Sequence, residues 1–353
     1  MPITLTDNYS APVRREILLC GSAYGGTYVP ALYQTKHLRL AAILANGSRR
    51  SITLAEQAGV PLLSGVEQLE QMPDAAIVAL GGELGFDVAK QLLSRNVPVL
   101  LEHPVKPEYL RPLLEISEAQ GICLNINSHF SELPASAEFI AVCQKLNQLS
   151  QPLVINVSCN SRTLFSTLDI LLRAFDGAEL NSISITALGE HYRAIQLNIG
   201  AVPCLISYQR WRHEQDDSTD APLGHQLSVT YPEGVACLTG TFGPFYWYPL
   251  LAASSKATHL YTNGYELERK IAGASVQDQI IQWRLKANIN ALDRLLNACD
   301  DPHKVCKSQS GAYLMQLSDS WHSIFTCVGF KVVPQKCTKL TESFKTVAGI
   351  LKT

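Results

Sequence analysis

A histidine between a glutamate and a proline is the clearest candidate for chemistry in the sequence. Glu102-His103-Pro104 follows the apolar run at residues 97–101. The proline disfavours the α-helical region for His103, so the ring has a defined direction. Because an unperturbed imidazole has a pKa of about 6.5, His103 could give or take a proton near neutral pH. The alternative is a structural histidine that caps the end of a strand.

A glycine-rich stretch, GSAYGGTY, follows the apolar run at residues 17–20. Gly21, Ala23 and Gly26 fit a dinucleotide-binding fingerprint with alanine at the second glycine. Gly21 would permit a tight turn, Ala23 would let a pyrophosphate approach, and Gly26 would let the next helix pack on its strand. The alternative is a turn that binds nothing. The predicted phosphate contacts come from Gly21, Ser22, Ala23, Tyr24, Gly25 and Gly26.

The residues after the second apolar run predict which dinucleotide is bound. An NAD site usually has an acidic residue about 20 residues after the fingerprint, where it binds the ribose 2′-hydroxyl. No acidic residue lies between Glu16 and Glu56. Two guanidinium groups stand there instead, which favours a 2′-phosphate and therefore NADP(H). Arg49 and Arg50 could also be solvated residues at a helix start. The predicted contacts are Asn46, Gly47, Ser48, Arg49 and Arg50, with Gly81, Glu102, His103 and Pro104 completing the cofactor site.

The elements that must position these residues alternate along the first third of the chain. Strands are predicted at 16–21, 38–46, 75–80, 97–104 and 122–128, with helices at 27–35, 51–59, 86–96 and 106–121. Strands that are apolar on both faces and alternate with helices indicate a parallel sheet covered on both sides. The predicted fold class is therefore α/β, with an N-terminal Rossmann doubly wound sheet at residues 1–127.

Shorter, alternating strands follow in the second half, at 153–160, 182–188, 194–200, 204–211, 225–231 and 235–242. Pro232-Glu233-Gly234 predicts a hairpin turn between the last two. A helix with an apolar stripe is predicted at 275–299. This pattern indicates a mostly antiparallel sheet in an α+β substrate-binding and dimerisation domain at residues 128–353.

Composition excludes several classes of protein. The 353-residue chain has a net charge of −2, so nothing favours nucleic acid as a partner. The N-terminus lacks the features of a secretory signal, and no apolar run reaches the roughly 20 residues of a membrane span. We therefore expect a cytoplasmic protein without membrane contact. The ten cysteines form no CxxC pair, which favours free thiols. Cys299, His303 and Cys306 match no common zinc spacing, so no metal is predicted.

The chain resembles the glucose-fructose oxidoreductase and inositol dehydrogenase superfamily, whose members carry Glu-x-Pro at this strand end before an antiparallel-sheet domain. Lysine is usual at the middle position, where this chain has His103. The thiazolinyl imide reductases of siderophore biosynthesis have histidine there. The stretches GSAYGGTY, LANGSRRS, SRTLFSTLDILL and TFGPFYW are also similar to theirs.

This resemblance implies NADPH-dependent reduction of a thiazoline C=N bond to a thiazolidine. The implied substrate is carried on the phosphopantetheine arm of a nonribosomal peptide synthetase carrier domain, and a homodimer is expected. His103 is the first candidate for the acid that protonates the imine nitrogen. The family often has tyrosine at the position of Phe130, so His129, water or the substrate's own phenol are alternative proton sources. Asp169 could bind the substrate or His103, or cap a loop.

The aromatic run at residues 242–248 suits a flat, apolar substrate, although sheet packing would use the same rings. Phe130, Phe245 and Trp247 are the predicted substrate contacts. Two other functions stay open. The first is a carbohydrate or cyclitol dehydrogenase of the same superfamily, which is disfavoured because His103 stands where such enzymes have lysine. The second is a non-catalytic dinucleotide-sensing regulator, which would not need a substrate domain.

Overall fold

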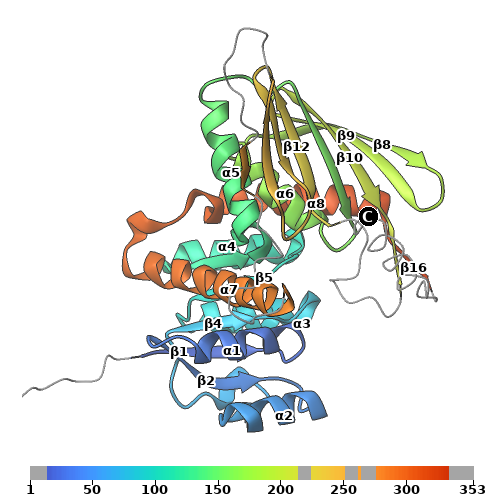
Figure 1. Ribbon diagram of the computed structural model, residues 1–353. Helices are drawn as coiled ribbons and strands as arrows, with labels where there is room; N and C mark the ends of the chain where they lie inside the picture. Colours follow the sequence, from blue (N-terminus) through green and yellow to red (C-terminus); the bar gives the residue numbers. More distant parts are fainter. Residues whose placement is uncertain (1–13, 214–223, 251–260, 264–275, 334–353) are drawn as a thin grey trace, which may run out of the picture.

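The computed structural model describes residues 14–213, 224–250, 261–263 and 276–333. Figure 1 shows a parallel sheet with its helices at one end of the protein and a broad, twisted sheet at the other. The two sheets together confirm the predicted α/β class with a second, mostly antiparallel sheet.

The first sheet is parallel and has the strand order β3-β2-β1-β4-β5-β6. This is the order of a doubly wound dinucleotide-binding sheet. The short strand β3 was not predicted, since only two residues pair there. The strands are β1 (Arg15–Cys20), β2 (Leu38–Leu44), β3 (Leu62–Leu63), β4 (Ala75–Val78), β5 (Val99–Glu102) and β6 (Leu124–Asn127). The helices are α1 (Tyr28–Tyr33), α2 (Arg49–Ala58), α3 (Gly82–Leu93) and α4 (Pro107–Gln120).

The second sheet has the order β15-β14-β13-β12-β7-β10-β9-β8, and only the β7–β10 pair is parallel. The predicted hairpin turn is confirmed, because Tyr231 at the end of β12 pairs with Gly234 at the start of β13. The strands are β7 (Val154–Asn160), β8 (Leu180–Leu188), β9 (Tyr192–Ile199), β10 (Val202–Gln209), β12 (Gln226–Tyr231), β13 (Gly234–Leu238), β14 (Phe245–Pro249) and β15 (Tyr261–Asn263). A small separate pair joins β11 (Trp211–His213) to β16 (Lys331–Val333).

Three helices cover one face of the second sheet: α5 (Pro134–Asn147), α6 (Leu164–Ala174) and α8 (Gly311–Val328). In Figure 1 they lie between the two sheets. Ten of the eleven residues of α6 are buried, including the polar Ser166, Thr167 and Asp169. Its apolar side chains belong to the larger hydrophobic core.

The long helix α7 (Val276–Asp300) returns from the second half of the chain to the first sheet, where Figure 1 shows it beside α1 and β5. Leu292 and Leu295 are fully buried in the same apolar cluster as Leu19 of β1 and Tyr28 of α1. The apolar stripe predicted this helix, but its packing partner was not predicted. Within the described residues, no helix is long and apolar enough to cross a membrane.

Candidate functional site

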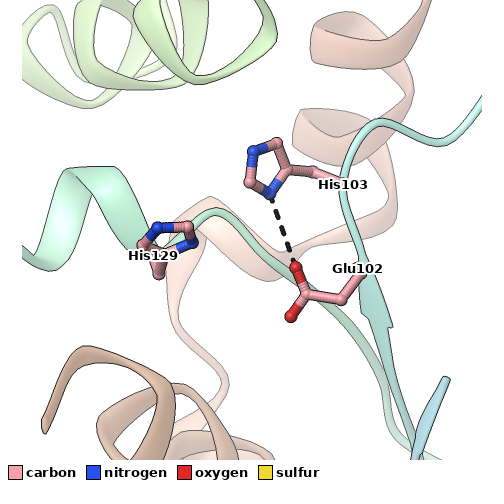
Figure 2. A group of neighbouring side chains, drawn as sticks. All are labelled: Glu102, His103 and His129. Atoms are coloured by element: carbon pink, nitrogen blue, oxygen red, sulfur yellow. Dashed lines mark ion pairs between the residues drawn. The ribbon is translucent and has the colours of Figure 1, made fainter. Parts of the chain in front are cut away.

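The candidate site lies at the carboxyl ends of β5 and β6, the edge of a doubly wound sheet where ligands bind. Glu102 ends β5 and pairs with Asn127, which ends β6. His103 follows, and its Nδ1 lies 2.7 Å from the backbone oxygen of Asn127. At that distance Nδ1 carries the hydrogen and donates it, because the carbonyl oxygen can only accept. Nε2 is therefore the nitrogen left to meet a ligand, and Figure 2 shows it on the side of the ring away from Glu102.

Three histidines from distant parts of the chain meet around this strand end. The ring centre of His129 lies 5.8 Å from that of His103. The third histidine is His225. Phe130 lies between the imidazoles of His129 and His225, with its ring centre 4.0 Å from that of His129 and 4.7 Å from that of His225. Phe165 of α6 stacks on His103 at 5.5 Å. We call these five rings the histidine cluster.

Burial makes the imidazoles of the cluster neutral. Loss of hydration lowers the pKa of His103, lowers that of His129 well below its ordinary value, and lowers that of His225 to about 3. For His103, the hydrogen bond to Asn127 and the negative charge of Asp169 act in the opposite direction. The cluster therefore offers N–H donors and lone pairs at neutral pH without a permanent positive charge.

Both ring nitrogens of His225 are already engaged. Nε2 lies 2.7 Å from Oγ of Ser166 in α6, and Nδ1 lies 3.1 Å from Oγ1 of Thr241. These two hydrogen bonds fix the orientation of the buried His225 ring. The ring of Phe130 packs on it and is thereby held in place. His225 was not recognised in the sequence, since a single histidine before a strand has no distinctive spacing.

Tyr24 links the glycine-rich turn to the cluster. Its hydroxyl lies 2.9 Å from Nδ1 of His129, and the two rings stack. Burial raises the pKa of Tyr24, so the phenol is neutral at physiological pH. The tyrosine of the predicted cofactor turn and the predicted catalytic histidine thus lie side by side.

Glu102 sits in a network that the sequence did not reveal. Its Oε1 accepts hydrogen bonds from the hydroxyl of Tyr28 and, at 2.9 Å, from Nδ2 of Asn127. The same amide lies 3.0 Å from Oδ1 of Asn288, which α7 contributes. Burial outweighs these hydrogen bonds and raises the pKa of Glu102 to about 8. The return of α7 to the first sheet thus helps to build the site.

Figure 2 shows Glu102, His103 and His129 around one point, and one donor atom from each lies within 4.8 Å of the others. Two observations weigh against a metal ion as the purpose of this group. His103 Nδ1 donates to Asn127, and one nitrogen of His129 is bonded to Tyr24. A cation that left both hydrogen bonds intact would have to bind His103 through Nε2, which lies on the side of the ring away from Glu102. The arrangement suits proton chemistry better than metal binding.

The glycine-rich turn has the backbone that the fingerprint requires at Gly21. Its φ is +100°, and a Cβ atom there would lie 2.6 Å from the backbone oxygen of Ala79. The close packing expected of Gly26 is found at Gly25, where a Cβ would lie 3.2 Å from the side chain of Leu19. At Gly26 the nearest atom would be at an ordinary 3.7 Å. Instead of one long helix, a 3₁₀ turn (Tyr24–Thr27) leads into the six-residue α1.

The remaining predicted cofactor residues surround the ends of β2 and β4. Ser48 caps α2 by accepting a hydrogen bond from the backbone N–H of Ser51, so Arg49 and Arg50 form the first helical turn. Both arginines are exposed. Gly81 precedes α3, and a Cβ there would meet no atom of the described residues within 4 Å, so packing against them does not demand glycine.

Asp169 does not offer a free carboxylate to a ligand. Both of its oxygens lie 3.0 Å from Nε of Arg173, and Oδ1 also accepts from the hydroxyl of Tyr313 at 2.8 Å. Arg173 in turn pairs with Glu132 at 3.0 Å. A buried carboxylate with these partners stabilises the packing of α6 against α8. We therefore correct the catalytic assignment of Asp169 to a structural one, with only a long-range electrostatic effect on His103.

The three predicted substrate rings have different surroundings. Phe130 belongs to the histidine cluster. Phe245, by contrast, is completely buried and packs edge-on against Phe139 of α5. Trp247 packs against Tyr231 and the large core. The substrate assignment of Phe245 and Trp247 is corrected to sheet packing, because β14 directs both rings to the face that the helices cover.

Two family models match the chain. One, described as "Oxidoreductase family, NAD-binding Rossmann fold", matches residues 15–128. The other, described as "Thiazolinyl imine reductase Irp3-like, C-terminal", matches residues 150–248. Residues 15–128 are therefore similar to this oxidoreductase family, and residues 150–248 to the Irp3-like C-terminal region. A search of curated proteins found no match.

Solved structures of the same fold include several dehydrogenases. An oxidoreductase from Agrobacterium radiobacter, in complex with NAD+, L-tartaric acid and magnesium, has a TM-score of 0.70 at 13% identity, covering 90% of this chain and 96% of that one. GenD2 of gentamicin A biosynthesis, in complex with NAD, has a TM-score of 0.66 at 12% identity, covering 90% and 95%. UDP-N-acetylglucosamine 3-dehydrogenase from Acidithiobacillus ferrooxidans has a TM-score of 0.63 at 14% identity, covering 88% and 97%. These likenesses establish the fold of this chain.

Proposed function

We propose that this oxidoreductase uses NADPH to reduce the C=N bond of a thiazoline to a thiazolidine. We further propose that the substrate is an aryl-thiazoline tethered to a nonribosomal peptide synthetase carrier domain during siderophore synthesis. The observation that carries the proposal is a neutral imidazole, His103, with Nε2 free, in an aromatic cluster of a chain with an Irp3-like C-terminal region.

The glycine-rich turn fits a dinucleotide. Gly21 has room for no side chain, and the adjoining 3₁₀ turn begins without a side-chain cap. A bound nicotinamide would supply the hydride for the imine carbon. Arg49 and Arg50 are the residues that would hold a 2′-phosphate, because they are exposed at the end of β2 and no carboxylate stands beside them in sequence. This is our basis for preferring NADPH to NADH.

In this proposal the proton for the imine nitrogen comes from Nε2 of His103 after the ring has taken a second proton from solvent, because the hydrogen of the neutral ring is on Nδ1. Asn127 fixes the ring through Nδ1, so Nε2 has a constant direction. Phe130 has no proton to give, and His129 is hydrogen-bonded to Tyr24. A positioned general acid typically contributes about 10²- to 10⁴-fold to a rate.

The rings around His103 favour a flat, apolar substrate. Phe165 stacks on the imidazole, and Phe130 meets it edge-on at 5.8 Å. A polyol needs hydrogen-bonding partners for several hydroxyls, which these aromatic faces do not provide. A dehydrogenase acting on a sugar is the second candidate, because one solved structure of this fold is a UDP-N-acetylglucosamine 3-dehydrogenase and a neutral imidazole can also accept a proton.

The face of the second sheet opposite the helices presents exposed apolar side chains, among them Leu205 and Tyr248. We propose that this face joins two copies of the chain in a homodimer.

A cofactor-consumption assay tests the proposed function. Purified protein is mixed with NADPH and a synthetic aryl-thiazoline thioester, and loss of absorbance of the reduced nicotinamide is followed. NADPH oxidation that requires the thiazoline is the expected result. Matched reactions contain NADH, or NADP+ with polyols and UDP-sugars. Turnover only with the polyols or sugars would replace the proposal with the second candidate, and binding without turnover would indicate a regulator.

A further inference from the structure

We propose that Arg284 of α7 binds the pyrophosphate of the dinucleotide, so that a helix from the second half of the chain contributes to the cofactor site of the first. The proposal rests on the dinucleotide part of the proposed function and does not depend on the thiazoline. It adds a cofactor contact that lies far along the chain from the glycine-rich turn.

Arg284 lies on the face of α7 that meets the candidate site. It precedes Asn288 by four residues, which is close to one helical turn, so the two side chains share a face of the helix. Asn288 is buried, and its Oδ1 accepts a hydrogen bond at 3.0 Å from Nδ2 of Asn127 at the end of β6. Arg284 is therefore one turn further toward the start of α7 on the face that packs against this strand end.

The charge of Arg284 acts on both regions of the candidate site. Burial raises the pKa of Tyr24 in the glycine-rich turn, and the positive charge of Arg284 opposes that rise. Burial lowers the pKa of His129 in the histidine cluster, and the same charge lowers it further. Tyr24 and His129 are themselves joined by a hydrogen bond of 2.9 Å. The guanidinium thus lies close to the point where the glycine-rich turn meets the histidine cluster.

The guanidinium of Arg284 is available to an anion. Arg173 and Arg294 both pair with Glu132, at 3.0 and 2.8 Å. Arg284 forms no ion pair within the described part of the chain, and its buried Nε has no hydrogen-bond partner there. Phe242 covers one face of the guanidinium, with its ring centre 5.3 Å from Cζ. Stacking on an aromatic ring leaves the N–H groups in the plane of the guanidinium free, so a ligand can supply the negative partner.

The neighbouring turn identifies the anion. Ala23, the second small residue of the fingerprint, lets a pyrophosphate approach the backbone, and Tyr24 follows it directly. The 2′-phosphate is assigned to Arg49 and Arg50 beyond β2, and both β1 and β4 lie between β2 and β5 in the sheet. Three strand spacings of about 4.8 Å put that phosphate out of reach of a side chain beside β5 and β6. The pyrophosphate is therefore the anionic group that the turn brings to Arg284.

Binding of ADP-ribose tests the proposal without turnover. ADP-ribose has the pyrophosphate but neither the nicotinamide nor the 2′-phosphate, and calorimetry measures its Kd. In R284Q the Kd should rise by about tenfold or more, because a charge-assisted pair is lost, and the Kd for NADPH and for NADH should rise by the same factor. R284K keeps the charge without the planar fork, so its Kd should be intermediate.

Lys286→Gln is the matched control, because it changes an exposed cation of the same helix that lies on a different face. Its Kd for ADP-ribose should equal the native value. Urea denaturation should show that R284Q and R284K are as stable as the native protein, and R284K decides the outcome if R284Q does not fold.

Native Kd values in R284Q and R284K would overturn the role of Arg284. A raised KM for the thiazoline with an unchanged Kd for ADP-ribose would also overturn it and assign the arginine to the substrate. Native protein that binds ADP-ribose but reduces no thiazoline would refute the proposed reaction and leave the role of Arg284 standing. Native protein that binds no dinucleotide and no ADP-ribose would overturn both.

Discussion

The glycine-rich edge of the first sheet and the histidine cluster are parts of one candidate site with opposite surroundings. Arg49 and Arg50 are exposed at the start of a well-capped helix. His103, His129 and His225 are buried, and the pKa of each is lowered by its surroundings. Exposed cations can hold a phosphate group with little cost to folding, whereas groups that move a proton need a dry and fixed setting.

This difference in burial predicts which substitutions should change the stability of the protein and which should change function alone. The exposed edge should behave as a separable binding feature. The buried cluster depends on α6, α7 and the ends of β5 and β6, so changes beneath it should lower the stability of the fold.

Among substitutions, the largest effect is expected at Asp169. Asp169→Ala removes the partner of the buried Arg173 guanidinium and should lower the free energy of unfolding by about 3 kcal/mol. Urea denaturation measures this loss, with Asp87→Ala on the exposed face of α3 as the control. If Asp169 is structural, the folded fraction should retain kcat within a few-fold. A stable variant without activity would return Asp169 to the catalytic group.

The stability of the folded protein should also depend on the proton of Glu102. The folded protein holds this proton up to about pH 8, whereas an unfolded glutamate loses it near 4.5. The folded state thus binds more protons within that window, and this contribution to stability is lost as the pH rises, by roughly 5 kcal/mol over the whole window. Urea titrations at pH 5, 7 and 9 measure the loss. In E102Q the slope should be shallower, and a slope equal to the native one would assign the pH dependence to other groups.

At the cluster, His103→Asn should reduce kcat more than tenfold, since the amide can keep a hydrogen bond to Asn127 but cannot act as an acid. KM for NADPH should change little. Steady-state kinetics measure both, with His37→Asn, an exposed histidine before β2, as the control. A near-normal kcat would leave His103 as a structural cap of the strand.

The smallest effect on the protein itself is expected at the exposed edge. Changing Arg49 and Arg50 together to Ala should raise KM for NADPH by about tenfold, which corresponds to about 1.4 kcal/mol, and leave KM for NADH unchanged. The unfolding free energy should stay the same. Lys36→Ala, at the opposite end of β2, is the matched control. Equal changes for both cofactors would remove the arginines from 2′-phosphate recognition.

The fold could be predicted from local pattern because each strand of the first sheet is a short apolar run with a helix after it. The carboxyl ends of parallel strands share one edge, so Glu102 and the glycine-rich turn could be assigned to one region from order alone. The position of α7 could not be predicted, because its apolar stripe could pack on any apolar surface of suitable shape.

The site was predicted where sequence neighbours are also spatial neighbours. Glu102-His103 and His129-Phe130 are such pairs. The contacts of Tyr28, Asn127 and His225 arise only when strand ends and distant loops meet, so no spacing revealed them. The aromatic run of β14 led to a wrong prediction of substrate contacts at Phe245 and Trp247. Alternation in a strand places both residues on one face of the sheet, but it does not say whether that face binds a ligand or packs in the core.

Transfer of deuterium tests the central claim most directly. NADPH deuterated at C4 of the nicotinamide, on one face or the other, is incubated with the protein and an aryl-thiazoline thioester, and the product is examined by NMR and mass spectrometry. We predict a thiazolidine with one deuterium at the former imine carbon, from one of the two labelled cofactors only. A product without deuterium, or no thiazolidine from either cofactor, would contradict the assignment of this site to NADPH-dependent imine reduction.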